Sequence, residues 1–158
     1  MKTVENLLHL DVSELTPKKK THEIKIDRIS RLLHKKGIEE DFNITIETID
    51  ADTLYDYESE IYEVENGKLK VNKKAMYKKG LEICNIAIID PKYNDPQLLN
   101  FLGITMKQPI PEVVWTKLLT KNEILSVSQR IIELSRNNLA GEDDYDAKLE
   151  KERNKIKN

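Results

Sequence analysis

The sequence has few of the residues from which catalytic centres and metal sites are usually built. It contains one cysteine and three histidines, the latter at positions 9, 22 and 34. A single cysteine excludes an intramolecular disulfide, and histidines so far apart, with no companion cysteine, do not match a zinc-binding motif. Cys84 lies in an apolar stretch, where a thiol packs as a small hydrophobic group. We therefore expect neither a metal site nor a reactive cysteine.

Glycine and long apolar runs are scarce as well. The five glycines are never closer than thirteen residues, which excludes a glycine-rich phosphate-binding loop. The longest apolar run is Ile86–Ile89, far short of the roughly 20 residues that span a membrane, and no signal peptide is recognisable. Acidic residues are abundant, yet no pair stands out as a general acid and base. The prediction is a cytoplasmic protein that is not an enzyme, with no cofactor and no membrane partner.

Charge is the most abundant feature, and it is arranged in blocks. Residues 18–36 contain eight Lys or Arg and two acids, residues 37–67 contain eleven acids and no Lys or Arg, and residues 68–79 contain six lysines and no acid. These blocks can pair with one another on one folded surface. Alternatively, one block attracts a partner of opposite charge and steers its approach.

Residue patterns indicate both strands and helices. A length of 158 residues fits one domain with tails. Alternating β-branched residues at 22–29 and 42–47 predict two strands with one buried face, joined through residues 30–40 by a long connection or a short helix. Helices are expected at about 50–137, with N-caps that include Asn72 and Asp95. The first is expected within 49–64, and Asn66-Gly67 either ends it or forms a tight turn before a brief strand at 68–71. The helix after Asn72 is expected to reach about Ile89, and Leu98, Leu99, Phe101 and Leu102 are expected on the buried side of the helix that Asp95 caps. A buried strand at 83–89 is the alternative to the second half of the helix that starts after Asn72.

These elements predict an α+β fold that is predominantly α-helical. We expect a small N-terminal antiparallel sheet or hairpin, packed beside a C-terminal helical bundle. The predicted domain organisation is a flexible N-terminal arm at 1–20 with a leucine-rich docking patch, a globular domain at 21–138 with strands at about 21–48, and a charged flexible tail at 139–158.

The clearest helix signal lies at Leu118–Ser135. Thr120 stands three residues before Glu123 and an apolar run follows, which is the spacing of a capping box. Apolar residues then recur at steps of three and four, so the helix has one apolar face that must be buried against the chain's own core or against a partner. As partner-binding residues we list Trp115, Ile124, Val127, Ile131 and Leu134; for Trp115, a place in the core is the simpler expectation.

The region Ile83–Ser135 resembles the tail assembly chaperones of long-tailed bacteriophages, of the type found in defective prophages of Gram-positive bacteria. The similarity lies in a helix that ends at Asp90-Pro91, a helix opened by Asp95, a glycine turn at Gly103, and the Leu118-Leu119-x-x-x-Glu123 start of a last helix that ends at Leu134-Ser135.

This resemblance implies a binding role in the cytoplasm of the bacterial host cell, and absence from the mature tail. Such chaperones keep the long, helical tape measure protein soluble until tail tube subunits assemble around it, so the implied partners are the tape measure protein and the tail tube protein. One alternative is a structural tail or baseplate component. Another is a regulator that binds nucleic acid through residues 18–36, but we do not expect nucleic acid because this block has no Phe, Tyr or Trp for stacking on bases.

Overall fold

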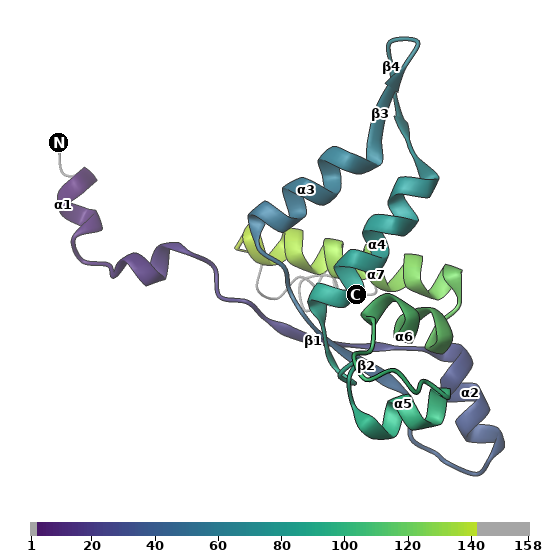
Figure 1. The fold of residues 1–158 in the computed structure, drawn as a ribbon. Coiled ribbons are helices and arrows are strands. Elements are labelled where there is room, and N and C mark those ends of the chain that lie inside the picture. Colours follow the sequence, from purple (N-terminus) through teal and green to yellow (C-terminus); the bar gives the residue numbers. More distant parts are fainter. Residues whose placement is uncertain (1–2, 142–158) are drawn as a thin grey trace, which may run out of the picture.

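The fold, obtained as a computed structural model, is described for residues 3–141 and confirms the α+β, predominantly helical class (Figure 1). A three-stranded antiparallel sheet lies beside a group of helices. The sheet has the order β1-β2-β5, with strands at Thr21–Lys25, Asn43–Glu47 and Ile88–Asp90. The charged tail was predicted at 139–158, but Leu139 still belongs to the last helix, and residues 142–158 lie outside the described residues.

β2 is the central strand, and its alternating pattern sets the core-facing side of the sheet. Ile44 and Ile46 are fully buried, and Ile24 of β1 lies directly opposite Ile44. Both predicted strands are therefore present. The first ends earlier than predicted, because helix α2 begins at Asp27 and runs through Asp27–Lys35, with Gly37 just beyond it at φ +82°. The undecided segment 30–40 thus contains the second half of a helix.

The third strand was not assigned correctly from the sequence. The helix that starts after Asn72 continues to Ala87, and only Ile88–Asp90 form β5, which pairs with β2. The predicted helix to Ile89 and the alternative strand at 83–89 are each right for part of this segment. An antiparallel pairing with a distant strand supplies hydrogen bonds that no local pattern encodes.

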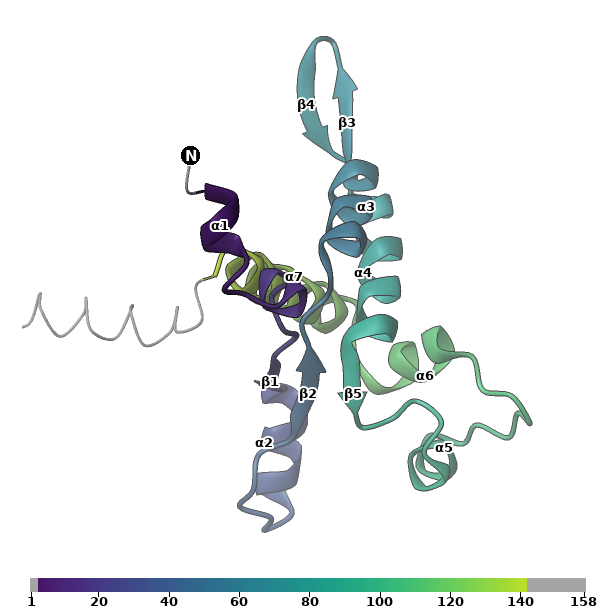
Figure 2. The same cartoon turned by 90° about the vertical axis from the view of Figure 1, so that its left-hand side faces the viewer.

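The helices pack around α7, which crosses the middle of the molecule (Figures 1 and 2). The capping box is confirmed, because Thr120 Oγ1 accepts from Glu123 N and Glu123 Oε1 accepts from Thr120 N. Asn72 and Asp95 are likewise N-caps. The helices of this group and of the connection after β5 are α3 Ala51–Ile61, α4 Lys73–Ala87, α5 Pro96–Leu102, α6 Pro111–Leu118 and α7 Lys121–Leu139.

At Gly80 of α4, α7 lies close enough to leave no room for a side chain. A Cβ atom on Gly80 would lie 2.9 Å from Ser128 Oγ and 3.3 Å from Ser128 Cβ. Ser128 Oγ donates to Leu125 O within α7, so this small polar side chain is satisfied without reaching across the interface. Small residues on both helices therefore let the two backbones come together.

A β-hairpin projects from the helical body between α3 and α4 (Figure 1). Its strands are β3 Tyr62–Glu65 and β4 Lys68–Val71, joined through Asn66 and Gly67, both with positive φ, as a two-residue hairpin turn requires. The helix expected within 49–64 is shorter than that span, because α3 ends at Ile61. All eight strand residues are exposed. Four apolar ones share one face, in the pairs Tyr62 with Val71 and Val64 with Leu69.

The N-terminal arm, residues 3–17, extends away from the body (Figure 1). It contains a short helix, α1 Thr3–Leu7, and a 3₁₀ helix, η1 Val12–Leu15, neither of which was predicted, and every arm side chain is exposed. The chain is anchored just after the arm. Asn138 Nδ2 donates to Lys18 O at 2.9 Å, and Lys20 exchanges two hydrogen bonds with Thr48.

Candidate partner-binding groove

The five residues predicted to bind a partner lie in the chain's own core. Trp115, Ile124 and Ile131 are 0% exposed, Val127 is 2% and Leu134 is 6%. The apolar face of α7 is covered by α3, α4 and α6, so none of these side chains is accessible to a partner in this structure. In this conformation all five pack in the core, and a role in binding a partner stays a prediction.

An apolar groove lies instead between α2 on one side and α5 with α6 on the other. Figure 2 shows α2 separated from α5 and α6 at the same end of the molecule. The groove has a volume of about 950 Å³. Its apolar walls consist of Ile29, Leu32 and Leu33 from α2, Phe101 and Leu102 from α5, and Leu118 from α6.

Helical spacing explains why these side chains gather. Ile29, Leu32 and Leu33 are three and four residues apart, so they share one face of α2. α5 starts at the Asp95 cap and ends at Gly103, whose φ of +71° turns the chain away after Leu102. Two of the groove side chains are largely accessible, since Phe101 is 79% exposed and Leu32 is 51% exposed. Large apolar side chains left open in a concave surface are typical of a binding site.

The rim of the groove is basic. Lys35 and Lys36 follow the apolar face of α2, and Lys117 lies on α6. Among the described residues that line the groove there is no acid, and no described acid forms an ion pair with any of these three lysines. An apolar floor with a positive rim favours an amphipathic segment that carries acidic residues beside its apolar face.

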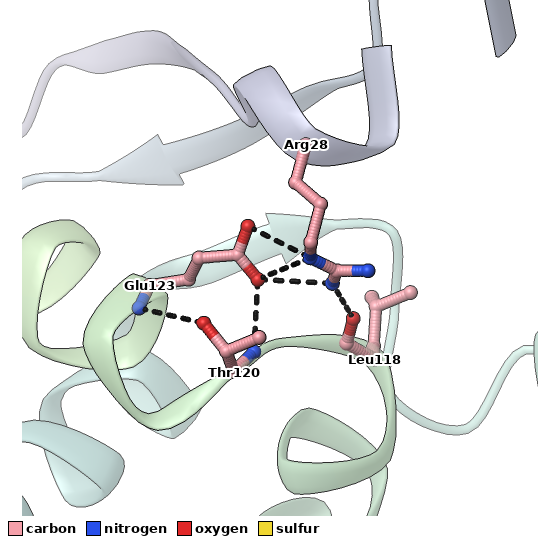
Figure 3. Close-up of polar contacts among 4 residues, drawn as sticks. All are labelled: Arg28, Leu118, Thr120 and Glu123. Carbon is pink, nitrogen blue, oxygen red and sulfur yellow. Dashed lines mark hydrogen bonds and ion pairs between the residues drawn. The ribbon is translucent and has the colours of Figure 1, made fainter. Parts of the chain in front are cut away.

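One arginine joins the two walls of the groove (Figure 3). Arg28 of α2 donates through Nε and Nη2 to the Glu123 carboxylate at distances of 2.9 to 3.2 Å, and its Nη2 also donates to Leu118 O at 2.9 Å. Glu123 is the same carboxylate that closes the capping box of α7 with Thr120. Arg28 therefore fixes α2 to the turn between α6 and α7, and so sets the distance between the walls.

Glu123 is held ionised by this arrangement. Its partial burial favours the neutral acid, but hydrogen bonds from Arg28 and from the Thr120 backbone outweigh that desolvation and lower the pKa of Glu123 below its usual value. The contact with Arg28 is thus an ion pair with several hydrogen bonds.

The groove residues on α2 were missed by the sequence analysis, although their spacing was readable. Residues 29–36 contain the i, i+3, i+4 pattern, but the segment was left undecided between a connection and a helix. Phe101 and Leu102 were assigned to the buried side of their helix, whereas Phe101 points out. The spacing of apolar residues predicts an apolar stripe on a helix, but it does not predict which neighbouring element covers that stripe.

The charge blocks pair with one another in part. Lys25 lies 3.6 Å from Asp41, Lys79 lies 3.0 Å from Glu60, and Lys70 lies 2.8 Å from Glu65. His34 Nε2 lies 3.0 Å from Asp41 Oδ1. The first alternative, pairing on one folded surface, is therefore correct for at least one member of each block.

Cys84 packs in the core of the part of the chain that the structure describes. Cys84 is buried, its thiol lies 3.9 Å from Ile124 O, and burial raises its pKa to about 12. Within residues 3–141, no three His, Cys, Asp or Glu side chains are grouped so that they could bind a metal ion.

Comparisons of this chain with protein families, with curated proteins and with solved structures found no match. Within residues 3–141, no helix has both the length and the apolar character needed to cross a membrane.

Proposed function

We propose that this chain is a non-enzymatic assembly chaperone that holds an amphipathic helical segment of a partner protein in the groove between α2, α5 and α6. The observation that carries the proposal is the groove itself, with exposed Leu32 and Phe101 above an apolar floor and three lysines at its rim. A helix that presents apolar anchors at i, i+3, i+4 and i+7 could place them between the two walls.

The resemblance of Ile83–Ser135 to phage tail assembly chaperones supports the choice of partner. On that basis the partner is the tape measure protein, met in the cytoplasm of the bacterial host before tail tube subunits assemble around it. An unassembled long helical protein exposes apolar stripes that drive aggregation, and covering such a stripe keeps the chain soluble. In this proposal the groove replaces the α7 face as the binding surface.

The test is coexpression with a fragment of a phage tape measure protein. We expect the fragment to remain in the soluble fraction and to elute with this chain in size-exclusion chromatography. Phe101→Asp should abolish both, because it places a charge on the apolar wall without disturbing a buried residue. Ile86→Asp is the matched control, since Ile86 is an exposed apolar residue of α4 outside the groove, and it should behave like the wild type.

Two outcomes would overturn the proposal. A fragment that aggregates equally with and without the wild-type chain would remove the chaperone function. A soluble complex that survives Phe101→Asp would place binding elsewhere on the surface. Recovery of this chain from purified tail particles would favour the structural tail or baseplate component instead.

A further inference from the structure

The N-terminal arm carries acidic residues, which complement the basic rim of the groove. Residues 3–15 contain the acids Glu5, Asp11 and Glu14 and no Lys or Arg. Every large apolar side chain of the arm is exposed, namely Val4, Leu7, Leu8, Leu10, Val12 and Leu15. An acidic, apolar segment with nothing covering it thus coexists in one chain with an apolar groove that has a basic rim.

The spacing of the arm residues fits the groove as well as their character does. Val4, Leu7 and Leu8 follow one another at i, i+3 and i+4, the spacing with which a helix inserts side chains into a groove. Glu5 lies next to this stripe, where it can meet a rim lysine such as Lys36 or Lys117. Charge complementarity of this kind favours one binding partner over another more than it adds affinity.

The arm and the groove of one chain lie at opposite ends of the same strand. The arm precedes β1, and α2 follows it, so the two leave β1 in opposite directions (Figure 1). The hydrogen bonds of Lys18 with Asn138 and of Lys20 with Thr48 hold the arm's base at the end of the strand away from α2. A groove on another copy is free of this constraint.

We infer that two copies of this chain exchange arms, with residues 3–15 of each copy docked in the α2–α5–α6 groove of the other. A reciprocal exchange closes a two-fold dimer and leaves no groove open. The arm then occupies the groove in place of the partner helix, and binding of the partner displaces the arm from the groove. This inference rests on the proposed use of the groove, but it is tested with the chain alone.

The experiment measures the dimer dissociation constant of the full chain by sedimentation equilibrium. We expect a dimer in the wild type, and a rise of at least about tenfold in the dissociation constant for Leu8→Asp in the arm and for Phe101→Asp in the groove. Both positions are highly exposed, so circular dichroism should show that the fold is retained. Ile86→Asp, outside both surfaces, should leave the dissociation constant unchanged.

Mixing the two variants tests the exchange itself. Leu8→Asp retains an intact groove and Phe101→Asp retains an intact arm, so a mixed dimer has one complete junction. We expect the mixture to associate more tightly than either variant alone, and added salt to weaken that association.

A wild-type chain that stays monomeric, or a dimer that is insensitive to Leu8→Asp, would overturn the inference. A mixture no tighter than its components would also overturn it. Capture of the tape measure fragment is a separate readout: Leu8→Asp should weaken the dimer and leave capture intact, so the dimer and the chaperone function can fail independently.

Discussion

Two helices of this protein carry similar apolar stripes and use them differently. In α7, Ile124, Val127 and Ile131 are covered by α3, α4 and α6. In α2, Ile29, Leu32 and Leu33 also share one helical face, but they form one wall of an open groove. The difference does not lie in the stripe. It lies in how many neighbouring elements the chain brings to each helix, and only the uncovered stripe is available to a partner.

The difference in burial between the two stripes is tested most directly by shortening a side chain in the buried stripe of α7. Ile131→Ala should lower the free energy of unfolding by about 2–5 kcal/mol, because Ile131 is fully buried and the removed atoms leave a cavity. Urea denaturation followed by circular dichroism measures the change. A loss below about 1 kcal/mol would mean that the packing around α7 is looser than described.

The α4–α7 contact can be broken by adding a methyl group rather than removing one. Gly80→Ala places Cβ 2.9 Å from Ser128 Oγ, and we expect a net loss of about 1–2 kcal/mol, since overpacking exceeds the gain of about 1 kcal/mol in helix propensity.

Ser128→Ala in the Gly80→Ala background should recover part of the lost stability by removing the crowding hydroxyl. Thermal melts of the four proteins in this double-mutant cycle measure the coupling. Additive effects would show that the two residues do not meet.

The link between the two regions is the Arg28–Glu123 ion pair. A double-mutant cycle of Arg28→Ala and Glu123→Gln should give a coupling free energy of about 1 kcal/mol. Larger couplings are typical of buried contacts, whereas the Arg28 side chain is 40% exposed. Denaturant titrations at neutral pH provide the four free energies. If the coupling is absent, the walls of the groove are held by apolar packing alone.

The same pair predicts a pH dependence. The pKa of Glu123 is lower in the folded protein than its ordinary value of 4.5. Its contribution is therefore present above about pH 4.5 and is lost as pH falls through the folded-state pKa. The stability difference between wild type and Glu123→Gln should shrink on acidification over this window. A difference that stays constant to pH 3 would contradict the assignment.

The smallest effect is expected in the groove. Leu32→Ala should change the free energy of unfolding by no more than about 0.5 kcal/mol, because half of this side chain is already in water. Measured beside Ile131→Ala, it compares an open aliphatic residue with a buried one. Leu32→Ala should nevertheless weaken binding at the groove, which the capture experiment can detect.

Some of the candidate site was readable from the sequence, and some was not. The stripe at residues 29–36 was present in the pattern, but residues 30–40 were left undecided because a short amphipathic segment between two strands fits both a connection and a helix. For the stripe on α7 the sequence left the core and a partner open, and in this structure the stripe packs in the core, as does Trp115. The hairpin at Asn66-Gly67 was only partly anticipated, since Lys68–Val71 was considered as a strand and its pairing strand was placed in a helix.

The sequence by itself determined where several elements begin and end. Asn72, Asp95 and the Thr120 and Glu123 pair start helices because their side chains bond free backbone N–H groups close by in the chain. The alternation at Asn43–Glu47 likewise gave a strand with one buried face. These are local effects, complete within a few residues.

Only the tertiary structure decided which apolar faces are covered. β5 forms because β2 lies beside it and pairs with it. Arg28 and Glu123 are 95 positions apart in the sequence and form an ion pair in the fold. The apolar stripe of α2 stays open because α5 and α6 lie across a groove from it. Burial depends on every element that packs against a face. A stripe of side chains therefore carries the same local pattern whether it forms a core or a binding groove.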